Sequence, residues 1–276
     1  MTRVERQYRL LALDMDGTLL DSNKRVLPRT AEALRELAAS GVALAFCTGR
    51  NASELGPYLG ELPFVRYGAL VSGALAFDLH ERRTLHVQPL ATEDALAVID
   101  AGEHEGAMAH VLAVHDSVVR TRDLEQLEEC HMGVYRPLYE DYAQHVDDPR
   151  DYVRTHEGEV LKVNLYHRNA ESRNRTRTRL ARLPLTVVDA ETTSLESTSR
   201  GISKARGLQA LCDHLGCTMD DVAMVGDADN DLEALAAVGM PVAMGNATPE
   251  VKSLARLVVA DNDHDGIAEL IAHLNW

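Results

Sequence analysis

The chain has 276 residues, of which 45% are hydrophobic and 26% charged, and its formal net charge is −15 at pH 7. This length is long for one simple domain and short for two full ones, so we expect a main domain with an inserted lobe. The acidic balance argues against nucleic-acid binding, which selects for clustered Lys and Arg, and the composition argues against disorder.

The four cysteines, Cys47, Cys130, Cys212 and Cys217, form no CxxC pair, and no histidine lies at zinc-ligand spacing. We therefore expect reduced, structural thiols. The N-terminal apolar run is too short for a signal sequence, and no run approaches the roughly 18 apolar residues of a membrane span. The sequence predicts a cytoplasmic protein without a membrane partner and leaves its oligomeric state open.

Buried strands and an amphipathic helix alternate in the first part of the chain. The run RLLALDMD, residues 9–16, indicates a buried strand, and residues 27–41 indicate a helix that begins near Pro28 and stops at Gly41. The run VALAFCTGR, residues 42–50, indicates a second buried strand that ends in a turn. Apolar runs without alternation, separated by helices, are typical of a parallel sheet covered on both faces.

The middle of the chain has a different pattern. Residues 69–90 indicate paired strands around a polar turn, and the alternation of strand and helix then becomes irregular. Further strands are predicted at residues 107–120, 159–167 and 183–190. We therefore predict an inserted α+β lobe over residues 85–190. Arginines crowd residues 168–182, but their spacing does not keep them on one side of a helix, so we expect a solvated surface helix there.

The alternation returns near the C-terminus. Helices are predicted at residues 203–216, 231–239 and 248–255, and strands at residues 220–227, 241–245 and 256–261. Thr248 is the expected N-cap of the last helix. We predict that residues 1–84 and 191–276 form one α/β core with a Rossmann-like parallel sheet, and that the lobe interrupts it.

Polar side chains follow three predicted strands, at the edge where an open parallel sheet binds ligands. Asp14 and Asp16 follow the first strand, and Thr48, Gly49 and Arg50 follow the second. The strand at residues 220–227 is followed by Asp227, Asp229, Asn230 and Asp231. Lys204 begins the helix that precedes that strand and can supply a cation.

These residue types indicate a phosphate site. Asp14 and Asp227 at neighbouring strand ends would repel each other unless a cation lay between them, and an all-oxygen donor set suits Mg²⁺. Backbone N–H groups of the turns, Thr48 and Lys204 could neutralise phosphate oxygens. Asp14 could then attack the phosphorus and form an aspartyl-phosphate. Asp16 could protonate the leaving group and later take a proton from water.

Each short motif alone is common in loops, but together, in order and each after a buried run, they favour the functional interpretation. They resemble the four motifs of the haloacid dehalogenase superfamily of phosphatases, namely DMDGTLLDS, FCTGR, GISKARGL and GDADND. The resemblance implies Asp14 as nucleophile, Asp16 as general acid/base, and Mg²⁺ bound by Asp14, the Asp16 carbonyl and Asp227. It implies phosphate contacts from Met15, Asp16, Thr48, Gly49 and Lys204, and support of both sites by Asn230 and Asp231.

The spacing of the motifs indicates a branch of that superfamily. Only a helix and a strand fit between Asp14 and Thr48, whereas a large cap fits between Thr48 and Lys204. This resembles the Cof-like sugar-phosphatase group, although Ser72 stands where that group commonly has Asn. The resemblance implies an α+β cap and a Mg²⁺-dependent phosphomonoesterase that acts on a small-molecule phosphate ester, such as a sugar phosphate. Arg50 and Asn230 are candidate substrate contacts.

Two alternatives stay open. A phosphomutase of the same superfamily would return the phosphoryl group to a sugar. A non-catalytic phospho-acceptor or metabolite-binding module would also combine aspartates, Thr and Lys on a parallel sheet. Asp16 and the large lobe argue against such a module, because a stable switch needs neither a general acid nor a substrate lid.

Overall fold

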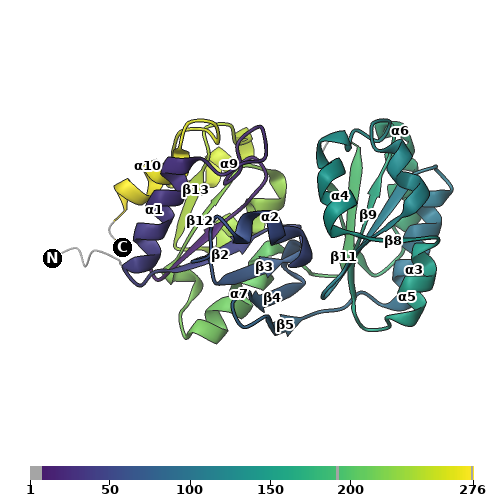
Figure 1. Ribbon diagram of the computed structural model, residues 1–276, viewed down its shortest axis with the longest axis horizontal. Coiled ribbons are helices and arrows are strands. Elements are labelled where there is room, and N and C mark those ends of the chain that lie inside the picture. The colour runs from purple at the N-terminus through teal and green to yellow at the C-terminus, as the bar shows by residue number, and fades with distance from the viewer. Residues whose placement is uncertain (1–7, 191–192, 275) are drawn as a thin grey trace. The chain divides into compact units, whose positions relative to one another are not determined.

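The computed structural model describes residues 8–190, 193–274 and 276 (Figure 1), and these form two compact units. The first unit comprises the described residues up to 49, residues 57–86 and the described residues from 203 on. The second comprises residues 50–56 and the described residues between 87 and 202. None of the helices in the described part of the chain is long and apolar enough to cross a membrane.

The first unit is built on an eight-stranded sheet with the order β14-β13-β12-β1-β2-β3-β4-β5. Its strands are β1 (Leu10–Leu13), β2 (Ala43–Cys47), β3 (Tyr67–Leu70), β4 (Leu75–Asp78), β5 (Arg83–Val87), β12 (Val222–Gly226), β13 (Met240–Ala243) and β14 (Leu257–Val258). The pairs from β14 to β3 are parallel, and β4 is antiparallel to β3. Every residue of β1 and β12 is buried, because the sheet is covered on both faces.

The helices of this unit begin and end at residues that fit those positions. They are α1 (Pro28–Ala39), α2 (Gly56–Leu59, shared with the second unit), α7 (Lys204–Leu215), α8 (Leu232–Ala237), α9 (Pro249–Leu254) and α10 (Gly266–His273). The Thr248 hydroxyl caps α9 by accepting from the Val251 N–H, as predicted. Gly216 ends α7 in the left-handed conformation, with φ of 62°. In Figure 1, α1 and α10 lie together, and they pack against each other.

The second unit contains a six-stranded sheet with the order β10-β11-β9-β6-β7-β8. Its strands are β6 (Met108–Ala113), β7 (Ser117–Arg120), β8 (Gln144–Val146), β9 (Val160–Tyr166), β10 (Leu185–Ala190) and β11 (Ser194–Ser199). Its helices are α3 (Thr92–Glu103), α4 (Arg136–Tyr142), α5 (Pro149–Thr155) and α6 (Ala170–Leu180). Helix α3 packs against α5, α6, β6 and β9 over one apolar core. The predicted fold class, a parallel α/β core with a second α+β sheet, is confirmed.

Two local predictions differ from the structure. Residues 107–120 form the antiparallel pair β6 and β7 rather than one strand, because the polar residues between them make a turn. Strand β11 has the sequence SLESTS, which is too polar to indicate a strand. It forms a strand because it pairs with β9 and β10. Helix α6 is a surface helix, as predicted, and its arginines pair with Glu105, Glu171 and Asp189.

Candidate active site

Three neighbouring parallel strands deliver polar side chains to one edge of the first unit's sheet. Strand β1 lies between β2 and β12. Asp14 follows β1, Thr48 follows β2 and Asp227 follows β12. Because the strands are parallel, their carboxyl ends share an edge, and this is where ligands bind in open α/β sheets.

Lys204 joins two of the predicted carboxylates. It is the first residue of α7 and is only 2% exposed. Its Nζ donates to Asp14 Oδ1 at 2.6 Å and to Asp231 Oδ1 at 2.7 Å. Burial alone would lower the pKa of Lys204, but the two carboxylates raise it well above its ordinary value. The ammonium group is therefore charged beside Asp14.

Asp231 organises the loop after β12. Its side chain is fully buried, and its Oδ2 accepts the backbone N–H groups of Asp227 at 3.0 Å and Ala228 at 3.2 Å. Its Oδ1 is occupied by Lys204. Both oxygens thus hold neighbouring groups in place, whereas Asp14 and Asp227 face each other across the loop ends.

One ligand atom from each of Asp14, Asp227 and Asp231 lies within 4.8 Å of the others. Burial raises the pKa of Asp14 well above its ordinary value; Lys204 opposes this effect, and Asp231 and Asp227 add to it. Burial also raises the pKa of Asp227. A divalent cation between the two carboxylates would remove their mutual repulsion.

The loop after β1 fits closely against Asp227. Gly17 has φ of +84°, and a Cβ there would lie 2.4 Å from Asp227 Oδ2, so only glycine suits the position. Thr18 donates from Oγ1 to Asp227 Oδ1 at 2.9 Å, and Asn246 donates to the Gly17 carbonyl at 2.8 Å. The carboxylate oxygens of Asp14 and Asp227 form a compact, all-oxygen ligand set, which fits a hard cation such as Mg²⁺. Sequence reasoning did not single out Thr18 or Asn246, although Thr18 lies inside the quoted first motif.

Asp16 is held by a residue that the motifs did not indicate. Lys24 Nζ lies 2.8 Å from Asp16 Oδ1, and the two side chains are 27% and 30% exposed. The Met15 side chain is fully buried, and its carbonyl accepts the N–H groups of Thr18 and Leu20. Any contact of Met15 with a phosphate would therefore use its backbone N–H.

The remaining predicted residues have separate surroundings. Thr48 is 2% exposed; its N–H donates to the Ala69 carbonyl, and its own carbonyl accepts the N–H of Ser72. Gly49 is the last residue of the first unit before the chain enters the second, in which Arg50 lies over the Tyr135 ring at 5.8 Å. Asn230 is exposed, and its side chain makes no hydrogen bond with another described residue. The structure thus brings together Asp14, Lys204, Asp227 and Asp231 within the first unit, whereas Arg50 belongs to the second unit.

The model of the haloacid dehalogenase-like hydrolase family matches residues 11–271. The chain belongs to this family. The sequence-based assignment to the haloacid dehalogenase superfamily, its Cof-like group and the phosphatase class of enzymes is thereby confirmed.

Known relatives of this haloacid dehalogenase-like hydrolase match it over nearly its full length. The pyridoxal phosphate phosphatase YbhA of Escherichia coli is 28% identical and aligns over 96% of this chain and 98% of its own. The HMP-PP phosphatase of Serratia proteamaculans is 30% identical over 96% of this chain and 95% of its own. The solved structure of a haloacid dehalogenase-like hydrolase from B. subtilis is similar with a TM-score of 0.85 at 25% identity, covering 97% of this chain and 100% of that one.

Proposed function

We propose that this haloacid dehalogenase-like hydrolase is a Mg²⁺-dependent phosphomonoesterase that forms an aspartyl-phosphate on Asp14. The observation that carries the proposal is the buried Asp14 carboxylate, 2.6 Å from the Lys204 ammonium and clustered with Asp227. A buried carboxylate with a cation on one side and a second carboxylate on the other is suited to a charged reaction centre.

Asp14, Asp227 and the Asp16 carbonyl would hold the Mg²⁺, with Asp231 and Asn230 in supporting positions. When bound, the cation would neutralise charge on the transferring phosphate. The Lys204 ammonium, the Thr48 hydroxyl and the N–H groups of Met15, Asp16 and Gly49 would bind the other phosphate oxygens.

The first step is a displacement at phosphorus. An Asp14 carboxylate oxygen forms a bond to phosphorus while the bond from phosphorus to the ester oxygen breaks. The protonated Asp16 gives its proton to the departing alkoxide, which leaves as an alcohol. Lys204 donates to Asp14 Oδ1, which orients the carboxylate and opposes the effect of burial on the Asp14 pKa.

The second step restores the enzyme. Asp16, now a carboxylate, takes a proton from a water whose oxygen attacks the phosphorus. The bond from phosphorus to Asp14 breaks, and inorganic phosphate leaves. One group thus serves as acid and then as base, which is consistent with its partial exposure near the loop surface.

The second unit is the proposed cap, which selects the leaving group. We propose a small phosphorylated metabolite as the substrate, with sugar phosphates as the predicted class and Arg50 and Asn230 as candidate contacts. The names of two relatives add pyridoxal phosphate and HMP-PP to the candidates. The cytoplasmic location stays a prediction.

The test is a phosphate-release screen over sugar phosphates, nucleotides, pyridoxal phosphate and HMP-PP, with and without Mg²⁺. We expect Asp14→Asn to lower kcat by on the order of a thousandfold or more, because no nucleophile remains. Asp213→Asn is the matched control, since Asp213 is an exposed residue of α7 whose side chain hydrogen-bonds only Gln209 among the described residues.

Different outcomes would separate the alternatives. Transfer of phosphate to a second sugar without its release would favour a phosphomutase. A stable phosphorylated Asp14 without turnover would favour the phospho-acceptor module. Full Mg²⁺-dependent turnover by Asp14→Asn would exclude the covalent mechanism.

A further inference from the structure

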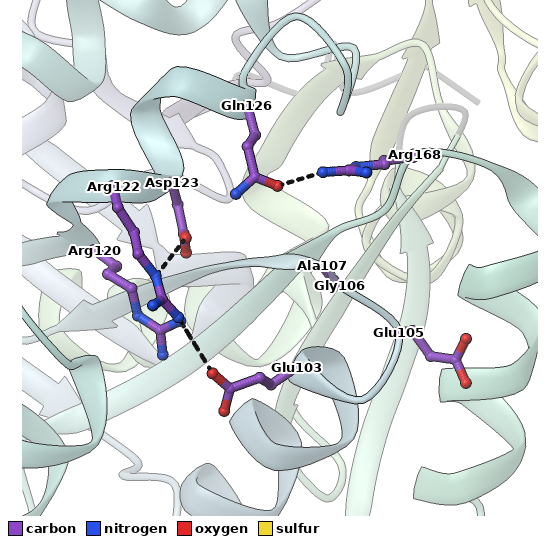
Figure 2. A pocket seen from close by; sticks show the side chains of 9 residues that line it. All are labelled: Glu103, Glu105, Gly106, Ala107, Arg120, Arg122, Asp123, Gln126 and Arg168. Atoms are coloured by element: carbon purple, nitrogen blue, oxygen red, sulfur yellow. Dashed lines mark hydrogen bonds and ion pairs between the residues drawn. The ribbon is translucent and has the colours of Figure 1, made fainter.

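A cavity of about 270 Å³ lies within the second unit, at one edge of its six-stranded sheet (Figure 2). Strand β6 runs antiparallel to β7 and β9, so its start lies beside their ends, and the cavity forms among these segments. The polar residues that line it are Glu103, Glu105, Arg120, Arg122, Asp123, Gln126 and Arg168. None of them was assigned to the phosphatase site.

Arg120, the last residue of β7, is a buried cation with unused hydrogen-bonding capacity. It is 7% exposed, its Nη1 donates to Glu103 Oε1 at 3.2 Å, and its Nη2 lies 3.6 Å from Asp148 Oδ1. Its Nε is buried and has no hydrogen-bond acceptor among the described residues. A buried charged donor without an acceptor is costly, so a ligand that accepts from this guanidinium would gain affinity.

Arg122 and Arg168 are the more accessible cations of the cavity, with side chains 69% and 51% exposed. The guanidinium nitrogens of Arg122 lie 3.5 Å from Glu103 and 3.8 Å from Asp123, without a hydrogen bond to either. Arg168 donates to the Gln126 side-chain oxygen at 2.8 Å and pairs with Glu129 at 3.0 Å. Figure 2 shows Gln126 and Arg168 pointing toward each other from separate segments, with Arg120 and Arg122 beside Glu103.

The carboxylates around the wall pair with these cations but do not use all of their N–H donors, since the buried Arg120 Nε has no acceptor among the described residues. Glu103 is shared by Arg120, Arg122 and Arg150. Asp148 also lies 3.6 Å from Arg120, and Asp148 and Asp100 both pair with Arg150. Burial raises the pKa of Asp123, and Arg120 and Arg122 oppose this effect. Figure 2 shows the Glu105 carboxylate directed away from the arginines, and it pairs with the arginines of α6.

We propose that this cavity binds a small oxyanion, that is, a molecule with a phosphate or carboxylate group. Guanidinium groups present paired N–H donors that match the oxygens of both groups. The Gln126 amide adds a neutral donor. The volume is just below the range typical of small-molecule sites, which suits a compact anion. The proposal does not depend on the catalytic role of Asp14.

Isothermal titration calorimetry on the full chain tests the site, with inorganic phosphate and succinate as separate probes. The test variant is Arg122→Gln/Arg168→Gln. The matched control is Arg154→Gln/Arg182→Gln, which removes the same charge from exposed positions outside the cavity. Circular dichroism confirms that each variant is folded, and any phosphate bound at the catalytic aspartates is common to all three proteins.

We expect the wild type and the control to bind one equivalent of phosphate or succinate that the test variant binds about tenfold or more weakly. Loss of the phosphate equivalent alone identifies a phosphoryl ligand, and loss of the succinate equivalent alone identifies a carboxylate ligand. Equal binding of both probes by all three proteins would overturn the proposal. So would an equal loss in the control, because the effect would then be one of net charge.

Discussion

Lys204 contributes both to the stability of the first unit and to its candidate active site. The ammonium is buried and donates to both Asp14 and Asp231. Buried ion pairs contribute little relative to apolar replacements, but loss of one partner leaves an uncompensated charge. The same contacts therefore make the residue structurally sensitive and chemically useful.

We expect Lys204→Met to lower the free energy of unfolding by about 3–5 kcal/mol, because Asp14 and Asp231 are left buried without their cation. Adding Asp231→Asn should restore part of this loss by removing one of the two carboxylates, while activity stays low. Urea denaturation without added metal measures both effects. A double variant no more stable than Lys204→Met would contradict this account.

A substitution at Gly17 tests whether the close fit between the loop after β1 and Asp227 matters for metal binding. We expect Gly17→Ala to raise the Mg²⁺ concentration needed for half-maximal activity by about tenfold or more, because its Cβ displaces the Asp227 carboxylate. Gly41→Ala is the matched control, since Gly41 has φ of +98° and its Cβ would meet nothing within 4 Å. Both variants should lose about 1–2 kcal/mol of stability from backbone strain.

Comparing the two variants separates the effect of backbone strain on stability from the effect of the Asp227 contact on Mg²⁺ binding. Equal Mg²⁺ requirements in Gly17→Ala and Gly41→Ala would show that the contact with Asp227 does not matter. Metal titration of activity and thermal unfolding of the same samples provide both readouts.

At the scale of elements, a buried carboxylate secures the antiparallel edge of the first sheet. The Asp78 side chain is fully buried at the end of β4; its Oδ2 accepts two hydrogen bonds from Arg66, and its Oδ1 accepts the N–H groups of His80 and Glu81. Burial alone would raise the pKa of Asp78, but Arg66 and the two N–H groups lower it below its usual value. The ionised carboxylate thus fixes the turn between β4 and β5.

We expect Arg66→Gln to lower the free energy of unfolding at pH 7 by about 1 kcal/mol, a small value because Arg66 is 40% exposed and screened. A depressed carboxyl pKa stabilises the fold above the unfolded pKa of about 4, and this effect is lost as the pH falls through the folded pKa. The variant and the wild type should therefore converge in stability at acid pH. Denaturant titrations between pH 3 and 7 measure the difference, with exposed Arg83→Gln as the control.

The predicted elements were accurate where burial dominates the sequence pattern. Strands β1, β2 and β12 are continuous apolar runs, and the polar residues that follow them do share one sheet edge. Strand β11 is polar and depends on its neighbours, so no local pattern reveals it. The Asp16–Lys24 ion pair depends on the fold of a loop, which spacing alone does not predict.

At the scale of the whole molecule, buried cations lie at both sites although the protein carries an excess of acidic side chains. The chain has 43 acidic and 28 basic side chains, yet the candidate catalytic cluster and the second unit's cavity both contain buried cations. Buried cations in an acidic protein mark positions where negative charge is compensated or received. The two sites thus share a buried cation as a common feature, although each lies in its own unit and has its own contacts.

The division into two units predicts that Mg²⁺ stabilises one unit against thermal unfolding and not the other. Because the proposed Mg²⁺ ligands all belong to the first unit, saturating Mg²⁺ should raise the unfolding temperature of that unit by about 5–10 °C and leave the second unit unchanged. Differential scanning calorimetry should then resolve two transitions of which one shifts. Asp227→Asn should abolish the shift, since it removes a proposed ligand without changing the second unit. A single transition, or two that shift equally, would show that the units unfold together and that metal binding stabilises the chain as one body.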